Sequence, residues 1–106
     1  MIKEFHIQIP LNFEESFTLL QQSGRAISGW GKNNVDSKHG YIEWKQSFWL
    51  LTGSTLISAQ LKSKGDNETS VVVLVHKPMQ VVDPFGICSK VFGKLDRSVR
   101  KHLAKR

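Results

Sequence analysis

The 106-residue sequence is poor in cysteine and has no long apolar run. Its single cysteine, Cys88, excludes an internal disulfide and suits a reducing compartment. No stretch approaches the ~20 apolar residues that a membrane-spanning helix needs. The first ten residues alternate apolar and polar side chains, unlike the apolar block of a secretion signal. We therefore expect a cytoplasmic protein without a membrane span.

The sequence also lacks the common signatures of cofactor sites. The glycine-containing segment 29–34 ends in Asn34, where a dinucleotide-binding loop has its third glycine, and it follows a predicted helix instead of a strand. The four histidines are scattered, without the spacing of metal ligands. We predict no cofactor and no metal.

Acidic residues are scarce at the C-terminal end, and this explains the net charge of +6. Residues 1–85 carry eight Lys/Arg and eight Asp/Glu, so their charges cancel. Residues 86–106 carry seven Lys/Arg and one Asp, which gives this segment the whole net charge of +6. The whole excess of positive charge is therefore expected on the closing segment. A local basic surface of this kind favours acidic partners or nucleic acid.

The closing segment reads as one long amphipathic helix. Asp83 can cap it and Pro84 fits its first position. Apolar side chains recur at three- and four-residue spacing at Cys88, Val91, Phe92, Leu95, Val99 and Leu103. About twenty helical residues span roughly 30 Å, and a compact chain of this length, with a radius of gyration of about 13 Å, is only slightly wider than that. Such a helix must cross the whole body, and we expect it to pack along a β-sheet.

The preceding residues supply that sheet and one further helix. Residues 3–9 alternate as a half-buried strand, and Asn12 with Glu15 resembles a capping box that starts a helix. Gly24 can close this helix in the left-handed conformation, unless Ala26 and Ile27 extend it. Residues 37–40 read as a hairpin turn. Further strands are predicted over residues 41–48, 55–62 and 69–76, with an irregular strand before the hairpin and residues 79–82 prolonging the last strand.

The strand at residues 69–76 contains five consecutive apolar residues, 71–75. Both of its faces are therefore apolar, and the second face needs at least partial cover. A second subunit could supply this cover, which makes a homodimer possible. The element order predicts one two-layer α+β domain over residues 1–106, with an antiparallel sheet and both helices on one face.

This order resembles a small helix-grip domain of the START-like, Bet v1-like (polyketide-cyclase-like) superfamily. The local similarities are residues 7–10, which lead into the first helix, and the run from Phe92 to Leu103 in the last helix. The resemblance implies an apolar ligand held between the sheet and the last helix, and some members are enzymes. The TATA-binding-like fold has a similar element order and would imply nucleic-acid binding instead.

Two binding hypotheses and one catalytic hypothesis follow. An apolar small molecule would contact Trp44, Phe48, Phe92 and Leu95, although these side chains could equally fill the interior. Nucleic acid or an acidic protein would bind the basic helix face formed by Lys90, Lys94, Arg97 and Lys101. Acid–base catalysis would require Asp36, His39 or Glu43 to project into a cavity. Turn chemistry and an exposed strand face explain these three residues without catalysis, so we favour a non-enzymatic binding domain.

Overall fold

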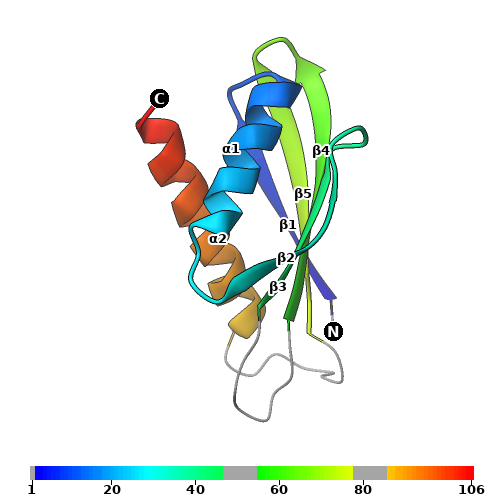
Figure 1. Cartoon of the computed structure of the whole chain (residues 1–106), viewed down its shortest axis with the longest axis vertical. Coiled ribbons are helices and arrows are strands. Elements are labelled where there is room, and N and C mark those ends of the chain that lie inside the picture. The colour runs from blue at the N-terminus through cyan, green and yellow to red at the C-terminus, as the bar shows by residue number, and fades with distance from the viewer. Residues whose placement is uncertain (1, 47–54, 78–85) are drawn as a thin grey trace.

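A computed structural model describes residues 2–46, 55–77 and 86–106. The described elements are β1 (Ile2–Ile9), α1 (Phe13–Arg25), β2 (Trp30–Asp36), β3 (Tyr41–Gln46), β4 (Thr55–Gly65), β5 (Glu68–His76) and α2 (Ile87–Ala104). This order of strand, helix, four strands and helix confirms the predicted α+β architecture (Figure 1).

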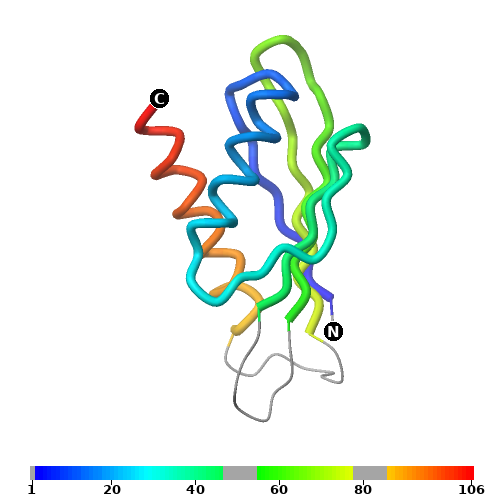
Figure 2. Tube along the Cα trace, in the orientation of Figure 1, coloured from blue at the N-terminus to red at the C-terminus, as the bar shows by residue number. Residues whose placement is uncertain are grey.

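The strands form one antiparallel sheet in the order β1-β5-β4-β3-β2. Both helices lie on the same side of this sheet, as Figure 2 shows in the chain trace. Alternate strand residues face the helices because side chains alternate along a strand. The buried members of this inner face are Ile7, Ile9, Trp30, Ile42, Trp44, Gln46, Thr55, Ile57, Ala59, Leu61, Thr69, Val71, Val73, Val75 and Lys77.

Helix α1 begins as predicted but does not end at Gly24. The side-chain oxygen of Asn12 accepts a hydrogen bond of 2.8 Å from the backbone N–H of Glu15. The helix continues through Gly24 to Arg25, and Ala26 follows in a right-handed conformation. Gly24 is therefore a buried residue in the last turn of the helix, and the prediction that it closes the helix in a left-handed conformation is wrong.

Helix α2 begins later than predicted. Gly86 has φ = 62°, in the left-handed region, so the helix starts at Ile87 instead of running through from Pro84. The predicted cap Asp83 and Pro84 lie outside the described residues, as does the predicted continuation of the last strand at 79–82. The expected apolar stripe is confirmed, because Cys88, Val91, Leu95 and Val99 are all almost fully buried.

Neither of the two described helices covers the opposite face of the sheet (Figure 1). The predicted turn at residues 37–40 joins β2 to β3. On this outer face Val72 and Leu74 of β5 are only half-buried, and Ile2 is 60% exposed. Neither described helix combines the length and the apolar character needed to span a bilayer.

Candidate functional site

Side chains fill the interface between the sheet and α2 around Leu95 and Phe92, whereas a hollow of about 370 Å³ remains between β1 and the C-terminal half of α2. Leu95, one of the predicted pocket residues, has no exposed surface. Phe92 is half-buried and stacks on Phe5 of β1, with ring centroids 4.5 Å apart and planes 7° from parallel. Phe48 lies outside the described residues. Leu95 and Phe92 therefore pack against protein atoms in this structure.

Trp44 is separated from Phe92 across the width of the sheet. Trp44 belongs to β3, whereas Phe92 stacks on the edge strand β1, and β5 and β4 lie between these strands. Three strand spacings correspond to roughly 14 Å. The structure therefore does not bring these two predicted pocket residues together.

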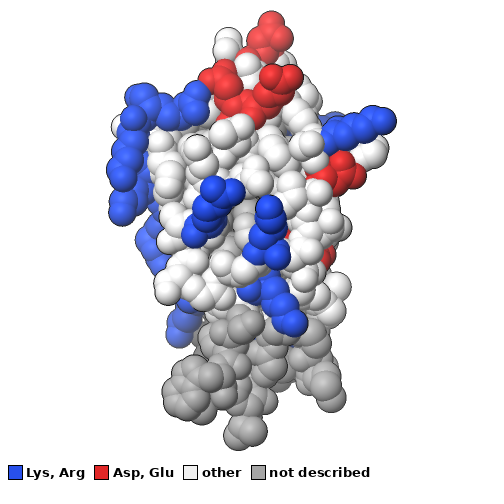
Figure 3. Space-filling model, viewed as in Figure 1, with Lys and Arg blue, Asp and Glu red and all other residues white. Residues whose placement is uncertain are grey.

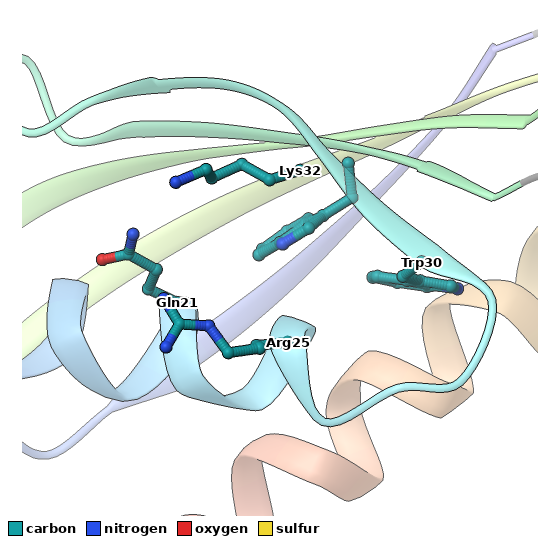
Figure 4. Close-up of a pocket in the computed structure, with 5 residues that line it drawn as sticks. Gln21, Arg25, Trp30 and Lys32 are labelled. Carbon is teal, nitrogen blue, oxygen red and sulfur yellow. The ribbon is translucent and has the colours of Figure 1, made fainter.

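Trp44 instead adjoins a hollow between α1 and the β2–β3 edge of the sheet. Its ring lies against Gly24 of α1 and 5.5 Å from the ring of Trp30, with the planes tilted by 44°. The hollow has a volume of about 110 Å³. Its lining consists of Gln21, Arg25, Trp30, Lys32 and Trp44, and we call it the indole pocket (Figure 4).

Hydrogen bonds hold Trp30 in place at the start of β2. Trp30 is the cross-strand partner of Gln46, and its indole N–H donates to the side-chain oxygen of Gln46 at 2.5 Å. The ammonium of Lys94 lies 3.5 Å from the same oxygen. Because a buried indole N–H needs an acceptor, Gln46 fixes one wall of the pocket.

The indole pocket is electropositive. Arg25 comes from the last turn of α1 and Lys32 from β2, and both are exposed. The described residues that line the pocket include no acidic side chain. Among the described residues neither cation forms an ion pair. The pocket therefore combines two aromatic walls with two cations that have no acidic partner in the described parts of the chain.

A row of buried polar side chains lies on the inner face near the pocket. Gln46 pairs across the strands with Thr55. Lys77 directly follows His76, the partner of Leu56, and so extends the same row. All three side chains of this polar row, Gln46, Thr55 and Lys77, are at most 3% exposed. The Thr55 hydroxyl has no hydrogen-bond partner among the residues that the structure describes, which is unusual for a buried polar group.

The predicted catalytic cluster lies on the hairpin and the outer face of the sheet. The ring of His39 and the carboxylate of Asp36 are 2.7 Å apart, and this hydrogen bond lowers the pKa of Asp36 below its usual 3.8. The Tyr41 hydroxyl donates to Glu43 at 2.7 Å. Burial, followed by this hydrogen bond, raises the pKa of Tyr41.

Glu43 borders a hollow of about 180 Å³ on the outer face of the sheet, and neither it nor Asp36 nor His39 lines the indole pocket. No cluster of potential metal ligands occurs in the described segments.

The predicted basic residues lie along α2, where Figure 3 shows a column of Lys and Arg side chains. Lys90, Arg97 and Lys101 are exposed. Lys94 is half-buried and directed toward Gln46 instead. Three of the four predicted residues therefore share an exposed face of the helix.

Sequence reasoning singled out Trp44 but missed the rest of the indole pocket. Gln21 and Arg25 come from α1, and Trp30 and Lys32 come from the segment with the weakest strand pattern. The two indoles were visible in the sequence, but their pairing depends on the β2–β3 register, which a bulge between Lys32 and Asn34 shifts.

Comparisons with known proteins found similarity at the level of structure alone. No family model and no curated protein matches the sequence. Norcoclaurine synthase from Thalictrum flavum, in complex with dopamine and hydroxybenzaldehyde, is similar with a TM-score of 0.67 and 10% identity. That alignment covers 100% of this chain and 87% of the synthase.

Two further solved structures have the same arrangement. Ara h 8.0201 gives a TM-score of 0.63 at 10% identity, with both chains covered completely. The di-domain aromatase/cyclase BexL from the BE-7585A biosynthetic pathway gives 0.61 at 13% identity. The alignment covers 98% of this chain but only 44% of BexL, so the chain spans less than half of that two-domain protein.

Proposed function

We infer from the helix-grip fold, which this chain shares with START-like and Bet v1-like proteins, that the protein is a small non-enzymatic binding domain for an apolar small molecule. The observation that carries this proposal is the indole pocket, where Trp30 and Trp44 form two aromatic walls beside a hollow. Apolar walls with a few polar groups are typical of small-molecule sites. The similar synthase holds two small aromatic molecules in its structure.

The proposed site differs in position from the one expected from the sequence. The expected site lay between the sheet and α2, where Leu95 is now fully buried and Phe92 stacks on Phe5. Of the expected residues, Trp44 lines the pocket, and we propose that Phe92 and Leu95 support the core behind it.

The size of the pocket indicates the size of the ligand. An apolar cavity of roughly 150 Å³ can hold benzene. A pocket of about 110 Å³ that opens to solvent therefore fits about one aromatic ring, with the remainder of the ligand outside. We propose single-ring aromatic compounds as the first ligands to test, followed by short fatty acids.

Tryptophan fluorescence tests this proposal directly. Replacing Trp49 by Phe leaves Trp30 and Trp44 as the only indoles, so that a change in emission reports on the pocket. We expect saturable changes with single-ring aromatic compounds. Gln21→Phe should block the pocket, whereas Gln22→Phe, at the neighbouring exposed position of α1, should not. The proposal is wrong if no compound changes the emission, or if both variants bind equally well.

The excess charge of +6 favours a second candidate function, the binding of nucleic acid or an acidic protein. Lys90, Arg97 and Lys101 present three cations along an exposed helix face, and such a row can meet a row of phosphates. Replacing these three residues by Glu should abolish binding to a short duplex. Wild-type affinity should fall steeply between 50 and 200 mM salt, by a factor set by the number of phosphates contacted. Salt-independent binding would exclude this function.

We also retain the homodimer as a proposal. The outer face of β5 exposes part of Val72 and Leu74 beside the exposed Ile2. Sedimentation analysis of the wild-type protein and of Leu74→Glu tests this: a dimer that the substitution separates supports it, and a wild-type monomer contradicts it.

A further inference from the structure

We propose that the indole pocket selects ligands that carry a negative charge, with a carboxylate bound between Arg25 and Lys32. This inference rests on the proposed function, because it names the ligand class of the same site. It adds that charge, and not only apolar surface, determines which small molecules bind.

The lining of the pocket separates into a polar end and an aromatic end. Figure 4 shows the side-chain ends of Gln21, Arg25 and Lys32 at one end of the pocket and Trp30 at the other. The polar end presents a guanidinium, an ammonium and an amide, all of which can donate hydrogen bonds. This arrangement fits a planar ligand whose ring lies toward the indoles and whose acidic group lies between the cations.

Two other arginines of the protein have carboxylate partners, whereas Arg25, Arg97 and Lys32 have none among the described residues. Arg100 pairs with Asp96 at 3.1 Å, and Arg106 pairs with Glu15. Arg25 and Lys32 have no such carboxylate among the described residues, and no acid lines the pocket. A ligand carboxylate would supply the missing partner, and the planar guanidinium of Arg25 can bind it through two parallel hydrogen bonds.

Arg25 also has a structural role that the test must separate from ligand binding. It lies in the last turn of α1, where a cation interacts favourably with the partial negative charge at the helix end. Loss of Arg25 can therefore lower stability without any ligand. A comparison of charged and neutral ligands removes this ambiguity, because a change in stability affects both alike.

Benzoate and benzamide provide this comparison, since they have nearly the same shape and differ in charge. We expect the full chain to bind benzoate about four- to 25-fold more tightly than benzamide in low salt, with the preference shrinking as salt screens the charges. Both cations are exposed, so each should contribute about two- to fivefold. Arg25→Gln and Lys32→Gln should each weaken benzoate binding by that factor and leave benzamide binding unchanged.

Lys38→Gln and Lys62→Gln remove exposed cations that do not line the pocket, and they should retain the benzoate preference. Equal binding of benzoate and benzamide would overturn the charge selection while leaving the proposed function intact. Failure of both compounds to bind would overturn the two together. An equal loss of benzoate binding in the control variants would show that net charge, and not the pocket, is responsible, which also refutes the inference.

Discussion

The two helical glycines, Gly24 near the end of α1 and Gly93 in the middle of α2, should respond in opposite ways to replacement by alanine. A Cβ at Gly24 would overlap the Trp44 ring at atoms Cε2, Nε1 and Cζ2. A Cβ at Gly93 of α2 would lie 3.2 Å from a guanidinium nitrogen of Arg97, which is the mobile end of an exposed side chain. Gly24→Ala therefore forces a buried ring to move, whereas Gly93→Ala does not.

The size of the effect follows from two opposing terms. Alanine is favoured over glycine inside a helix by about 1 kcal/mol. Overpacking a filled core costs about 1–3 kcal/mol, and Trp44 is only 2% exposed. The two terms together predict that Gly24→Ala lowers the free energy of unfolding by up to about 2 kcal/mol, whereas Gly93→Ala raises it by up to about 1 kcal/mol. For a chain of this size the difference corresponds to melting temperatures separated by roughly 10 °C.

Urea unfolding followed by circular dichroism, with melting curves in parallel, measures both variants against the wild type. Tryptophan emission should change in Gly24→Ala and remain unchanged in Gly93→Ala, because only the first substitution displaces an indole. Equal stability of Gly24→Ala and Gly93→Ala would refute the close packing of Trp44 on α1. It would also refute the position of Trp44 as a wall of the indole pocket.

Three further predictions concern polar groups. Thr55→Val should stabilise the fold by about 1 kcal/mol in urea unfolding, because valine has the same shape and removes a buried hydroxyl without a partner; a loss of stability would contradict this. The raised pKa of Tyr41 means that the folded protein keeps the phenolic proton above pH 10.0, where the unfolded chain releases it. Stability is therefore full below pH 10.0 and falls above it, and Tyr41→Phe should reduce this fall in alkaline melting curves. His39→Ala should raise the pKa of Asp36 toward 3.8 in a carboxyl NMR titration, and an unchanged pKa would exclude their hydrogen bond.

Local patterns in the sequence were sufficient to predict the architecture. Asn12 and Glu15 predict the start of α1, because the capping hydrogen bond between them involves only residues close together in the sequence. The alternation around Ile42 and Trp44 identifies the inner face of β3, because side-chain direction alternates regardless of what the strand packs against. The apolar stripe through Leu95 identifies the buried side of α2, because residues three and four apart lie on the same side of any helix.

The candidate site depended on contacts between distant residues and was therefore predicted only in part. Gly24 was interpreted as the residue that ends the helix. In the structure the absence of a side chain at Gly24 instead leaves space for the ring of Trp44, twenty residues later in the chain. Trp30 reaches the pocket through the register of β2 on β3, and its partner Gln46 is specified by that register. The prediction of one continuous helix from Pro84 was wrong because Gly86 has a left-handed conformation, and α2 begins after it at Ile87.

The pairing of β1 with β5 has a consequence for synthesis of the chain. Ile2 is aligned with His76 and Ile9 with Thr69, so β1 meets its ladder partner β5 only after the residues between the two strands have been synthesised. Until then the edge of β1 and the apolar side chains of Ile7 and Ile9 lack their native cover. Nascent chains released before residue 68 should consequently be targets for chaperones and proteases, whereas chains that have completed β5 can close the sheet.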